Sequence, residues 1–243
     1  PAHAKKILEI TSIPQLKQVW NECQQENLPV LFLGQGSNVL FVEDFDGAVL
    51  INRLLGIQHE EDQYFHYLHV NGGEVWHDLV QWSIEQGIYG LENLALIPGC
   101  AGSAPIQNIG AYGCEVKDVI ESVEAVNLAT GEVETITGSD CGYSYRNSKF
   151  KHEWKNHYLI THVSYRLSKT FQPHLDYGNI RAALAENHIL TPSAKELRQS
   201  IIAIREKKLP NPKVLGNAGS FFMNPLVDAH TFEQLITRYP AIP

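Results

Sequence analysis

The chain has 243 residues, of which 44% are hydrophobic and 19% charged, and its formal net charge is −8. This composition is typical of a globular protein of one large or two small domains, and it excludes disordered and low-complexity chains. The acidic balance argues against a nucleic-acid partner, which needs a basic face, and no apolar stretch approaches the roughly 20 residues of a membrane span.

The first 69 residues predict a small α+β unit. Its expected strands are 5–10, 29–33, 39–42 and 47–51. A helix is expected from a cap at Ser12 to about Asn27, because apolar residues recur on one face and Pro14 lies in the first turn, where a missing N–H is tolerated. The turn Gly34 to Asn38 separates the second of these strands from the third.

The second predicted unit covers residues 70–204. Its strands are expected at 64–70, 119–128, 133–137 and 158–167, the second and third forming a hairpin. A helix over 74–86 ends at Gly87, and Ser193 to Glu196 form a capping box that opens a helix to Lys208. Because helices and strands do not alternate regularly, the pattern indicates an α+β fold and not a doubly wound parallel sheet.

The cysteines and histidines show no metal-binding pattern. The four cysteines include no C-x-x-C pair, and the eleven histidines include no H-E-x-x-H. We therefore expect no metal site, free thiols and a cytoplasmic location. Since the chain begins at Pro1 and ends just after a short amphipathic segment, we expect it to be part of a longer protein.

The segment Gly34-Gln35-Gly36-Ser37-Asn38 follows an apolar strand. Its glycines permit close approach of the backbone, and successive N–H groups in such a turn form a nest for phosphate oxygens. It is not a Rossmann fingerprint, because the third glycine and the following helix are missing. A simple glycine hairpin is the alternative.

A second segment rich in small residues runs from Gly99 to Gly113, where eight of fifteen residues are Gly, Ala or Ser. Long loops of this kind are uncommon inside a domain and are usually functional. The backbone can press against a flat or extended ligand, while Ser103, Gln107 and Asn108 offer hydrogen bonds. A packed loop without a ligand is the alternative.

Two later segments also carry chemistry. Arg146 lies among tyrosines, where its guanidinium can be held rigidly and offered to a carboxylate, although stacking on a tyrosine at the surface explains it equally well. The cations from Arg205 to Lys213 suit a diphosphate, but cations are also favoured at a helix C-terminus. Ser220 lies in a glycine-rich turn that can expose it as a proton donor, or it bonds its own loop. The turn is not G-x-S-x-G, so an acyl-serine hydrolase is not expected.

In this order the segments resemble the MurB family, the UDP-N-acetylenolpyruvoylglucosamine reductases of peptidoglycan synthesis. The similar stretches are 31–40, 90–99, 105–113, 145–148 and 216–222. The resemblance covers essentially the whole chain. It implies an α+β fold with two FAD-binding subdomains of the vanillyl-alcohol-oxidase and p-cresol-methylhydroxylase type, at 1–69 and 70–204. A truncated substrate-binding domain then begins at 205 and continues to 243.

The resemblance also implies the site residues. FAD would be held by Gly34, Gln35, Gly36, Ser37, Asn38, Pro98, Gly99, Ser103, Ile106 and Gly110. The UDP-sugar substrate would contact Tyr112, Tyr177, Lys208 and Asn224. Arg146 would stabilise the enolate formed after hydride transfer, and Ser220 would protonate it. The implied cofactor is FAD, the co-substrate is NADPH, and a monomer is expected. The third catalytic residue of the family, a glutamate, is expected beyond residue 243, and no glutamate of this chain is given that role.

Three other functions stay open at this point. A related flavin oxidoreductase with another substrate shares the expected fold, and a catalytically incomplete FAD or nucleotide-binding module shares the glycine-rich loops. A Rossmann dehydrogenase that binds NADP without flavin is the third. Tyr177, the Lys/Arg cluster and the turn around Ser220 favour an anionic sugar nucleotide.

Overall fold

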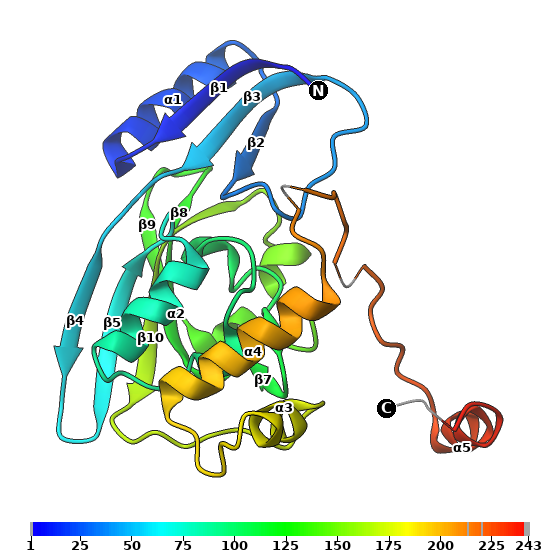
Figure 1. The fold of residues 1–243 in the computed structure, drawn as a ribbon. Coiled ribbons are helices and arrows are strands. Elements are labelled where there is room, and N and C mark those ends of the chain that lie inside the picture. The colour runs from blue at the N-terminus through cyan, green and yellow to red at the C-terminus, as the bar shows by residue number, and fades with distance from the viewer. Residues whose placement is uncertain (1, 213, 220, 241–243) are drawn as a thin grey trace.

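The computed structural model describes residues 2–212, 214–219 and 221–240 (Figure 1). The N-terminal elements are β1 (Ala4–Ile10), α1 (Ile13–Gln25), β2 (Val30–Leu33) and β3 (Phe45–Asn52). The three strands form a parallel sheet in the order β1-β3-β2. Helix α1 begins where the sequence predicts, because the Ser12 hydroxyl accepts a hydrogen bond from the Gln15 N–H at 3.3 Å.

Residues 39–42, expected to be a strand, have no regular structure, so this prediction was wrong. Leu40 and Val42 are 85% and 86% exposed. An apolar run becomes a strand only beside another strand that pairs with its N–H and C=O groups. In this sheet β3 already has β1 and β2 on its two sides, and the run 39–42 pairs with neither edge.

The second sheet is antiparallel and has five strands in the order β4-β5-β10-β8-β9. They are β4 (Ile57–Glu61), β5 (Phe65–Asn71), β8 (Ile120–Asn127), β9 (Val133–Thr137) and β10 (Tyr158–Ser168). The expected hairpin of β8 and β9 is confirmed. Strand β4 was not predicted, because four of its five residues are polar and it forms the edge of the sheet. The expected subdomain boundary at residue 69 falls inside β5.

Helices cover one face of this sheet, with α2 and α4 in front of it in the view of Figure 1. These helices are α2 (Trp76–Glu85), α3 (Ile180–Glu186) and α4 (Ala194–Lys208), whereas a fourth helix, α5 (Ala229–Arg238), lies apart from the sheet. Short 3₁₀ turns lie at Glu92–Leu94, Ala101–Ser103, Val116–Asp118, Gly138–Cys141 and Lys149–Lys151, and β6 (Gly110–Ala111) pairs with β7 (Cys114–Glu115). The expected helices 74–86 and 193–208 are confirmed, the second with its capping box. The mixture of helices and sheets confirms the α+β class.

The larger hydrophobic core lies between the five-stranded sheet and these helices. Trp76 of α2 and Tyr165 of β10 are fully buried and make an edge-to-face contact, with ring centroids 5.9 Å apart. The Trp76 indole N–H also donates to the Leu94 carbonyl at 2.9 Å. These contacts fix α2 and the segment that follows it, and so they position the loop that begins at Pro98.

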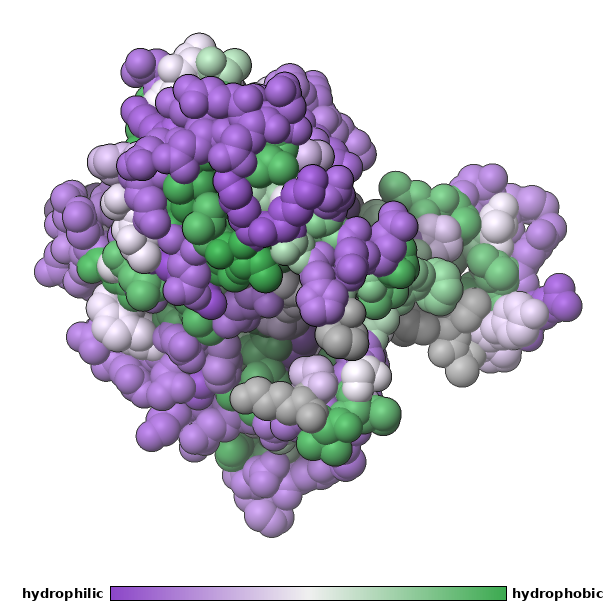
Figure 2. Space-filling model, turned by 90° about the horizontal axis from the view of Figure 1, so that it is seen from above, coloured by the Kyte–Doolittle hydropathy of each residue, from purple (hydrophilic) through white to green (hydrophobic). Residues whose placement is uncertain are grey.

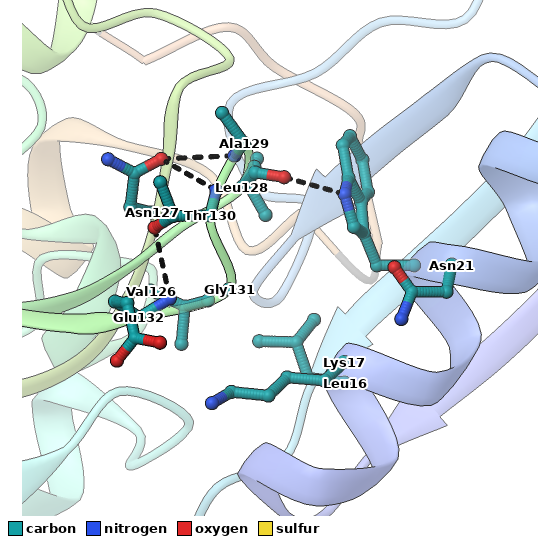
Figure 3. A pocket seen from close by; sticks show the side chains of 11 residues that line it. Leu16, Lys17, Asn21, Val126, Asn127, Leu128, Ala129, Thr130, Gly131 and Glu132 are labelled. Atoms are coloured by element: carbon teal, nitrogen blue, oxygen red, sulfur yellow. Dashed lines mark hydrogen bonds between the residues drawn. The ribbon is translucent and has the colours of Figure 1, made fainter.

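A smaller core joins α1 to the end of the five-stranded sheet. Leu16 of α1 packs in one cluster with Leu128 and Leu159, and the Trp20 indole N–H donates to the Leu128 carbonyl at 2.8 Å. A cleft of about 210 Å³ lies beside this contact, between α1 and residues 126–132, and Figure 3 shows the side chains that line it. None of the predicted site residues lines the cleft, so it is not the candidate active site.

The C-terminal segment projects from this body. Figure 1 shows α5 standing apart from the sheets, and α5 buries none of its residues. The view from above in Figure 2 shows apolar side chains gathered on the projecting part on the right. Phe222 and Leu226 are 86% and 97% exposed. Within the described ranges, no helix has both the length and the apolar character that crossing a membrane requires.

Candidate active site

The two glycine-rich loops lie against each other, although they are more than sixty residues apart in the sequence. The Gly99 N–H donates to Gln35 Oε1 at 3.1 Å, and Asn38 Nδ2 donates to Gln107 Oε1 at 3.2 Å. Behind them Gly34 adjoins Cys100 so closely that a Cβ on Gly34 would lie 3.1 Å from the Cys100 sulfur. The structure therefore brings together the two segments predicted to hold the cofactor.

Where the two glycine-rich loops meet, glycines leave the backbone uncovered by side chains. Gly36 and Gly99 have φ angles of +68° and +121°, which L-residues rarely adopt. A Cβ on Gly99 would lie 3.0 Å from Ser103 Oγ and 3.7 Å from Ser37 Oγ, so it would fill the space between the loops. Such a cradle of backbone and hydroxyl groups fits an extended dinucleotide with a pyrophosphate. The residues present therefore fit FAD.

Three of the residues predicted to bind the cofactor, Pro98, Ser103 and Ile106, lie outside the hydrogen-bonded contact between residues 34–38 and Gly99. Ser103 Oγ accepts from the Cys100 N–H at 3.0 Å and donates to the Cys100 carbonyl at 2.8 Å, so this hydroxyl closes its own 3₁₀ turn. Pro98, just before the loop, and Ile106, in its middle, are exposed. The Ile106 carbonyl accepts a hydrogen bond from the Ser148 hydroxyl at 2.6 Å, which connects this loop to the segment that carries Arg146.

Arg146 is attached to the second glycine-rich loop. Its guanidinium donates to the Asn108 carbonyl at 3.4 Å and to the Gly110 carbonyl, and it lies 5.5 Å from the centre of the Tyr145 ring. A Cβ on Gly110 would lie 2.9 Å from Arg146 Nη1, so only glycine leaves room for the side chain. Since a guanidinium has five N–H donors, several stay available to an anion. The contact with tyrosine was expected; the two carbonyl anchors were not.

Three residues of this region, none of them glycine, have left-handed backbone conformations. The φ angles of Asn108, Tyr112 and Arg146 are +45°, +50° and +54°. Each such residue costs on the order of 1–3 kcal/mol, and such strain is found most often at functional sites. Asn108 is fully buried and donates from Nδ2 to the Ser144 carbonyl at 2.9 Å, which helps to hold the arrangement.

Tyr112 and Tyr177, both predicted to contact the substrate, lie in neighbouring loops. Asn93 Nδ2 donates to the carbonyls of Tyr112 and His174, at 3.0 and 2.9 Å, and so ties the two loops together. A Cβ on Gly113 would lie 3.3 Å from Tyr177 Cβ. Tyr177 is 56% exposed, so its ring is accessible to a ligand. Asn93 was not predicted, because nothing in the sequence connects it with either loop.

Arg205 is a further cation at this place. Its guanidinium interacts with the Tyr112 hydroxyl and lies close enough to Arg146 for mutual repulsion. Burial lowers the pKa of Arg205 and raises the pKa of Tyr112. Arg205 Nε is buried and has no hydrogen-bond partner within the described residues. A bound anion would supply the missing acceptor and offset the repulsion. The cluster of cations was the only sequence signal for this residue.

Two of the predicted substrate residues are not brought into this group. Lys208 lies exposed in the last turn of α4, and Asn224 lies exposed between α4 and α5. Within the described residues, neither side chain forms a hydrogen bond or ion pair with Arg146 or Tyr112. Ser220, the predicted proton donor, lies outside the described residues.

Comparison with known proteins agrees with this arrangement. Residues 4–137 match the family of FAD binding domains. The chain is 56% identical to the UDP-N-acetylenolpyruvoylglucosamine reductase of Pasteurella multocida and 47% identical to that of Haemophilus ducreyi; each alignment covers 100% of this chain and 70% of the relative.

Two solved structures show that the fold is shared. The MurB reductase of Thermus caldophilus aligns with a TM-score of 0.62 at 22% identity, over 93% of this chain and 72% of that one. A solvent-stable cholesterol oxidase aligns with a TM-score of 0.52 at 13% identity, over 68% of this chain and 35% of that one. The predicted flavoprotein fold is thus confirmed, and by sequence the chain belongs to the UDP-N-acetylenolpyruvoylglucosamine reductase (MurB) family.

Proposed function

We propose that this chain reduces the enolpyruvyl group of UDP-N-acetylglucosamine enolpyruvate at the junction of the two glycine-rich loops. The family is one of FAD-dependent oxidoreductases of peptidoglycan precursor synthesis, the UDP-N-acetylmuramate dehydrogenases, and NADPH is the reductant. The observation that carries the proposal is the anchoring of Arg146 on the carbonyls of Asn108 and Gly110, within the loop that also lines the cofactor junction. The loop from Gly99 to Gly113 thereby both lines the expected FAD site and holds the guanidinium that would stabilise charge on the substrate.

The cofactor would be held mainly by backbone groups. We assign Gly34, Gln35, Gly36, Ser37 and Asn38 to its pyrophosphate, with Pro98, Gly99, Ser103, Ile106 and Gly110 beside the rest of the molecule. The bare backbone at Gly36 and Gly99 supports this assignment. When bound, FAD supplies the hydride chemistry of the reaction.

Arg146 would stabilise the negative charge that develops on the substrate. Reduction of an alkene next to a carboxylate places charge on that carboxylate and the adjoining carbon, and fixed cations stabilise such charge most effectively. The two carbonyl anchors hold the guanidinium before the substrate arrives, so little reorganisation is needed. Arg205 is close enough to contribute a second positive charge.

The remaining predicted residues would protonate or bind the substrate. Ser220 Oγ would give its proton to the carbon that carries the developing charge, and Tyr112, Tyr177, Lys208 and Asn224 would bind the sugar nucleotide. The tie that Asn93 makes between the loops of Tyr112 and Tyr177 supports their common role. Closure of the exposed Tyr177 over the substrate would exclude water from the reacting carbon.

The organisation of the chain is part of the same proposal. We assign residues 1–69 and 70–204 to two FAD-binding subdomains and 205–243 to the start of a substrate-binding domain. The exposed apolar residues around α5 support a separate role for the last segment. We also propose a monomer that acts in the cytoplasm without a nucleic-acid or membrane partner; the net charge of −8 supports the absence of nucleic acid.

Stopped-flow absorbance of the flavin tests the role of Arg146. In Arg146→Lys, reduction by NADPH should proceed as in the wild type. Reoxidation by the enolpyruvyl substrate should slow by about 10²–10³-fold, the usual effect of removing one preorganised donor. Arg166→Lys, at an exposed arginine of β10, is the matched control and should leave both rates unchanged. Reoxidation of Arg146→Lys at the wild-type rate would remove Arg146 from the reaction.

The same measurement separates the competing functions. A protein that binds FAD but is reduced by no nicotinamide would fit an incomplete binding module. Reduction by NADPH with no reoxidation by the enolpyruvyl sugar nucleotide would indicate a flavin oxidoreductase for another substrate.

A further inference from the structure

A group of metal-ligating side chains lies away from the candidate active site, on the hairpin of β4 and β5. His59 and Glu61 are two residues apart on β4, so their side chains are on one face of the sheet. Glu61 pairs directly with His66 of β5, which places the His66 side chain on that same face. His59 pairs with Leu68, so His59 and His66 are diagonal neighbours across the strands.

The three side chains converge on one point. His59 Nε2 lies 2.9 Å from His66 Nδ1, and Glu61 Oε2 lies 3.2 Å from the same nitrogen. One ligand atom from each residue lies within 4.8 Å of the other two. Ligand atoms about 2.1 Å from a tetrahedral ion are about 3.4 Å apart, so small side-chain rotations suffice to place all three around one ion.

The surroundings also suit a bound ion. Leu68, on the same face, is fully buried, whereas the side chains of His66 and Glu61 are 12% and 55% exposed. The cluster thus lies where the core-facing side of the sheet meets solvent. The protein supports the ligands from one side, and water can reach the fourth position from the other. A set of two imidazoles and one carboxylate is used by zinc and related ions in proteins.

We propose that His59, Glu61 and His66 form a binding site for a divalent transition-metal ion of the zinc type, with water as the fourth ligand. His59 would bind through Nε2 and His66 through Nδ1, and each neutral ring would keep its N–H on the other nitrogen. Glu61 would bind through one carboxylate oxygen. The sequence did not predict this site, because the spacing of its residues is meaningful only once the two strands pair.

Lys169 is the group that opposes binding. Its Nζ forms an ion pair with Glu61 Oε2 at 3.1 Å and repels a cation placed beside that oxygen. Lys169 directly follows the end of β10, and its side chain is 31% exposed, so it can move into solvent when an ion binds. Ion binding must therefore replace one positive charge at Glu61 with another, which makes Lys169 a determinant of affinity.

The effect of such an ion would be structural. Among the residues that the structure describes, strand β4 is the edge of the five-stranded sheet and pairs only with β5. An ion held by both strands would cross-link this edge close to its turn. No predicted cofactor or substrate residue is on the hairpin, so binding should stabilise the fold without entering the reaction.

Isothermal titration of the flavin-loaded protein with ZnCl₂ tests the proposal. The wild type should bind one more Zn²⁺ ion than His66→Gln does, and His59→Gln and Glu61→Gln should each weaken that binding by at least about tenfold. His3→Gln, which removes an exposed imidazole elsewhere, should behave as the wild type. Equal Zn²⁺ stoichiometry and affinity in the wild type and both histidine variants of the hairpin would overturn the proposal.

Two further readouts separate coordination from a general effect of the substitutions. Lys169→Met should bind Zn²⁺ several-fold more tightly than the wild type, because the competing cation is gone; unchanged or weaker binding would contradict Glu61 as a ligand. Co²⁺ in place of Zn²⁺ should give a visible absorption band of tetrahedral coordination in the wild type and lose it in His66→Gln. The same band in both proteins would place the ion elsewhere.

Discussion

Replacement of Gly34 by alanine tests the contact between the two cofactor loops. The new Cβ would stand 3.1 Å from the Cys100 sulfur and 3.4 Å from the Cys100 Cβ. Cys100 is 1% exposed, and its N–H and carbonyl are both bonded to Ser103, so it cannot turn away freely. We therefore expect the first loop to move away from the second.

The magnitude follows from the size of the clash. An added methyl group in a packed region costs roughly 1–3 kcal/mol. If FAD binds only when the loops are in contact, that cost appears in its affinity. Since about 1.4 kcal/mol corresponds to a factor of ten, the dissociation constant of FAD should rise roughly 5- to 150-fold. Titration of the apoprotein with FAD, followed by quenching of flavin fluorescence, measures the change.

A double-mutant cycle identifies the cause. In Cys100→Ala the sulfur is absent, so the added methyl group of Gly34→Ala meets only the 3.4 Å contact with Cβ. The double variant should therefore bind FAD within a few-fold of Cys100→Ala alone. If Gly34→Ala weakens FAD binding equally with and without the sulfur, or does not weaken it, the contact is not what positions the loop.

Three further variants test other parts of the structure. Asn93→Ala removes two hydrogen bonds of about 1 kcal/mol each to the loops of Tyr112 and Tyr177. Steady-state kinetics should therefore show a KM for the UDP-sugar raised by up to about 30-fold, and an unchanged KM would separate Asn93 from the substrate. Burial raises the pKa of Glu92, so its stabilising contribution is complete below the unfolded pKa of about 4.3 and is lost as pH rises through the folded pKa. The free energy of unfolding of Glu92→Gln, measured with urea, should therefore rise relative to that of the wild type as the pH increases above about 4.3, and a difference independent of pH would refute this. Trp20→Phe should lower the free energy of unfolding by about 1–2 kcal/mol through the lost indole hydrogen bond, and an unchanged urea midpoint would show that the bond contributes little.

Local chemistry made several elements of the fold predictable. Ser12 and Ser193 cap helices through their own hydroxyls, and Gly87, with φ of +74°, follows the end of α2. These interactions span three or four residues, so the sequence contains them entirely. The run 39–42 and the polar strand β4 were misjudged because strand formation depends on a distant partner.

In the candidate site, too, some features could be predicted from local sequence and others depend on the folded structure. The glycines at 34, 36 and 99 were informative because their conformational freedom is a property of the residue itself. Other features arise only after folding, and no spacing in the sequence indicates them. They are the contact of Gln35 with Gly99, the two hydrogen bonds of Asn93, and the Arg205 Nε donor, which has no partner among the described residues. The membership of the chain in a family was predictable because five short stretches occur in a fixed order.

The anchoring of Arg146 on the Asn108 and Gly110 carbonyls has a thermodynamic consequence. Residues 108–110 belong to the loop beside the cofactor cradle, so any shift of that backbone also shifts the guanidinium. If FAD orders this loop, it must also change the affinity for the anionic substrate, and linkage requires the substrate to change the affinity for FAD by the same factor. Cofactor and substrate are then reciprocally coupled, and loss of the cofactor weakens substrate binding through the loop itself.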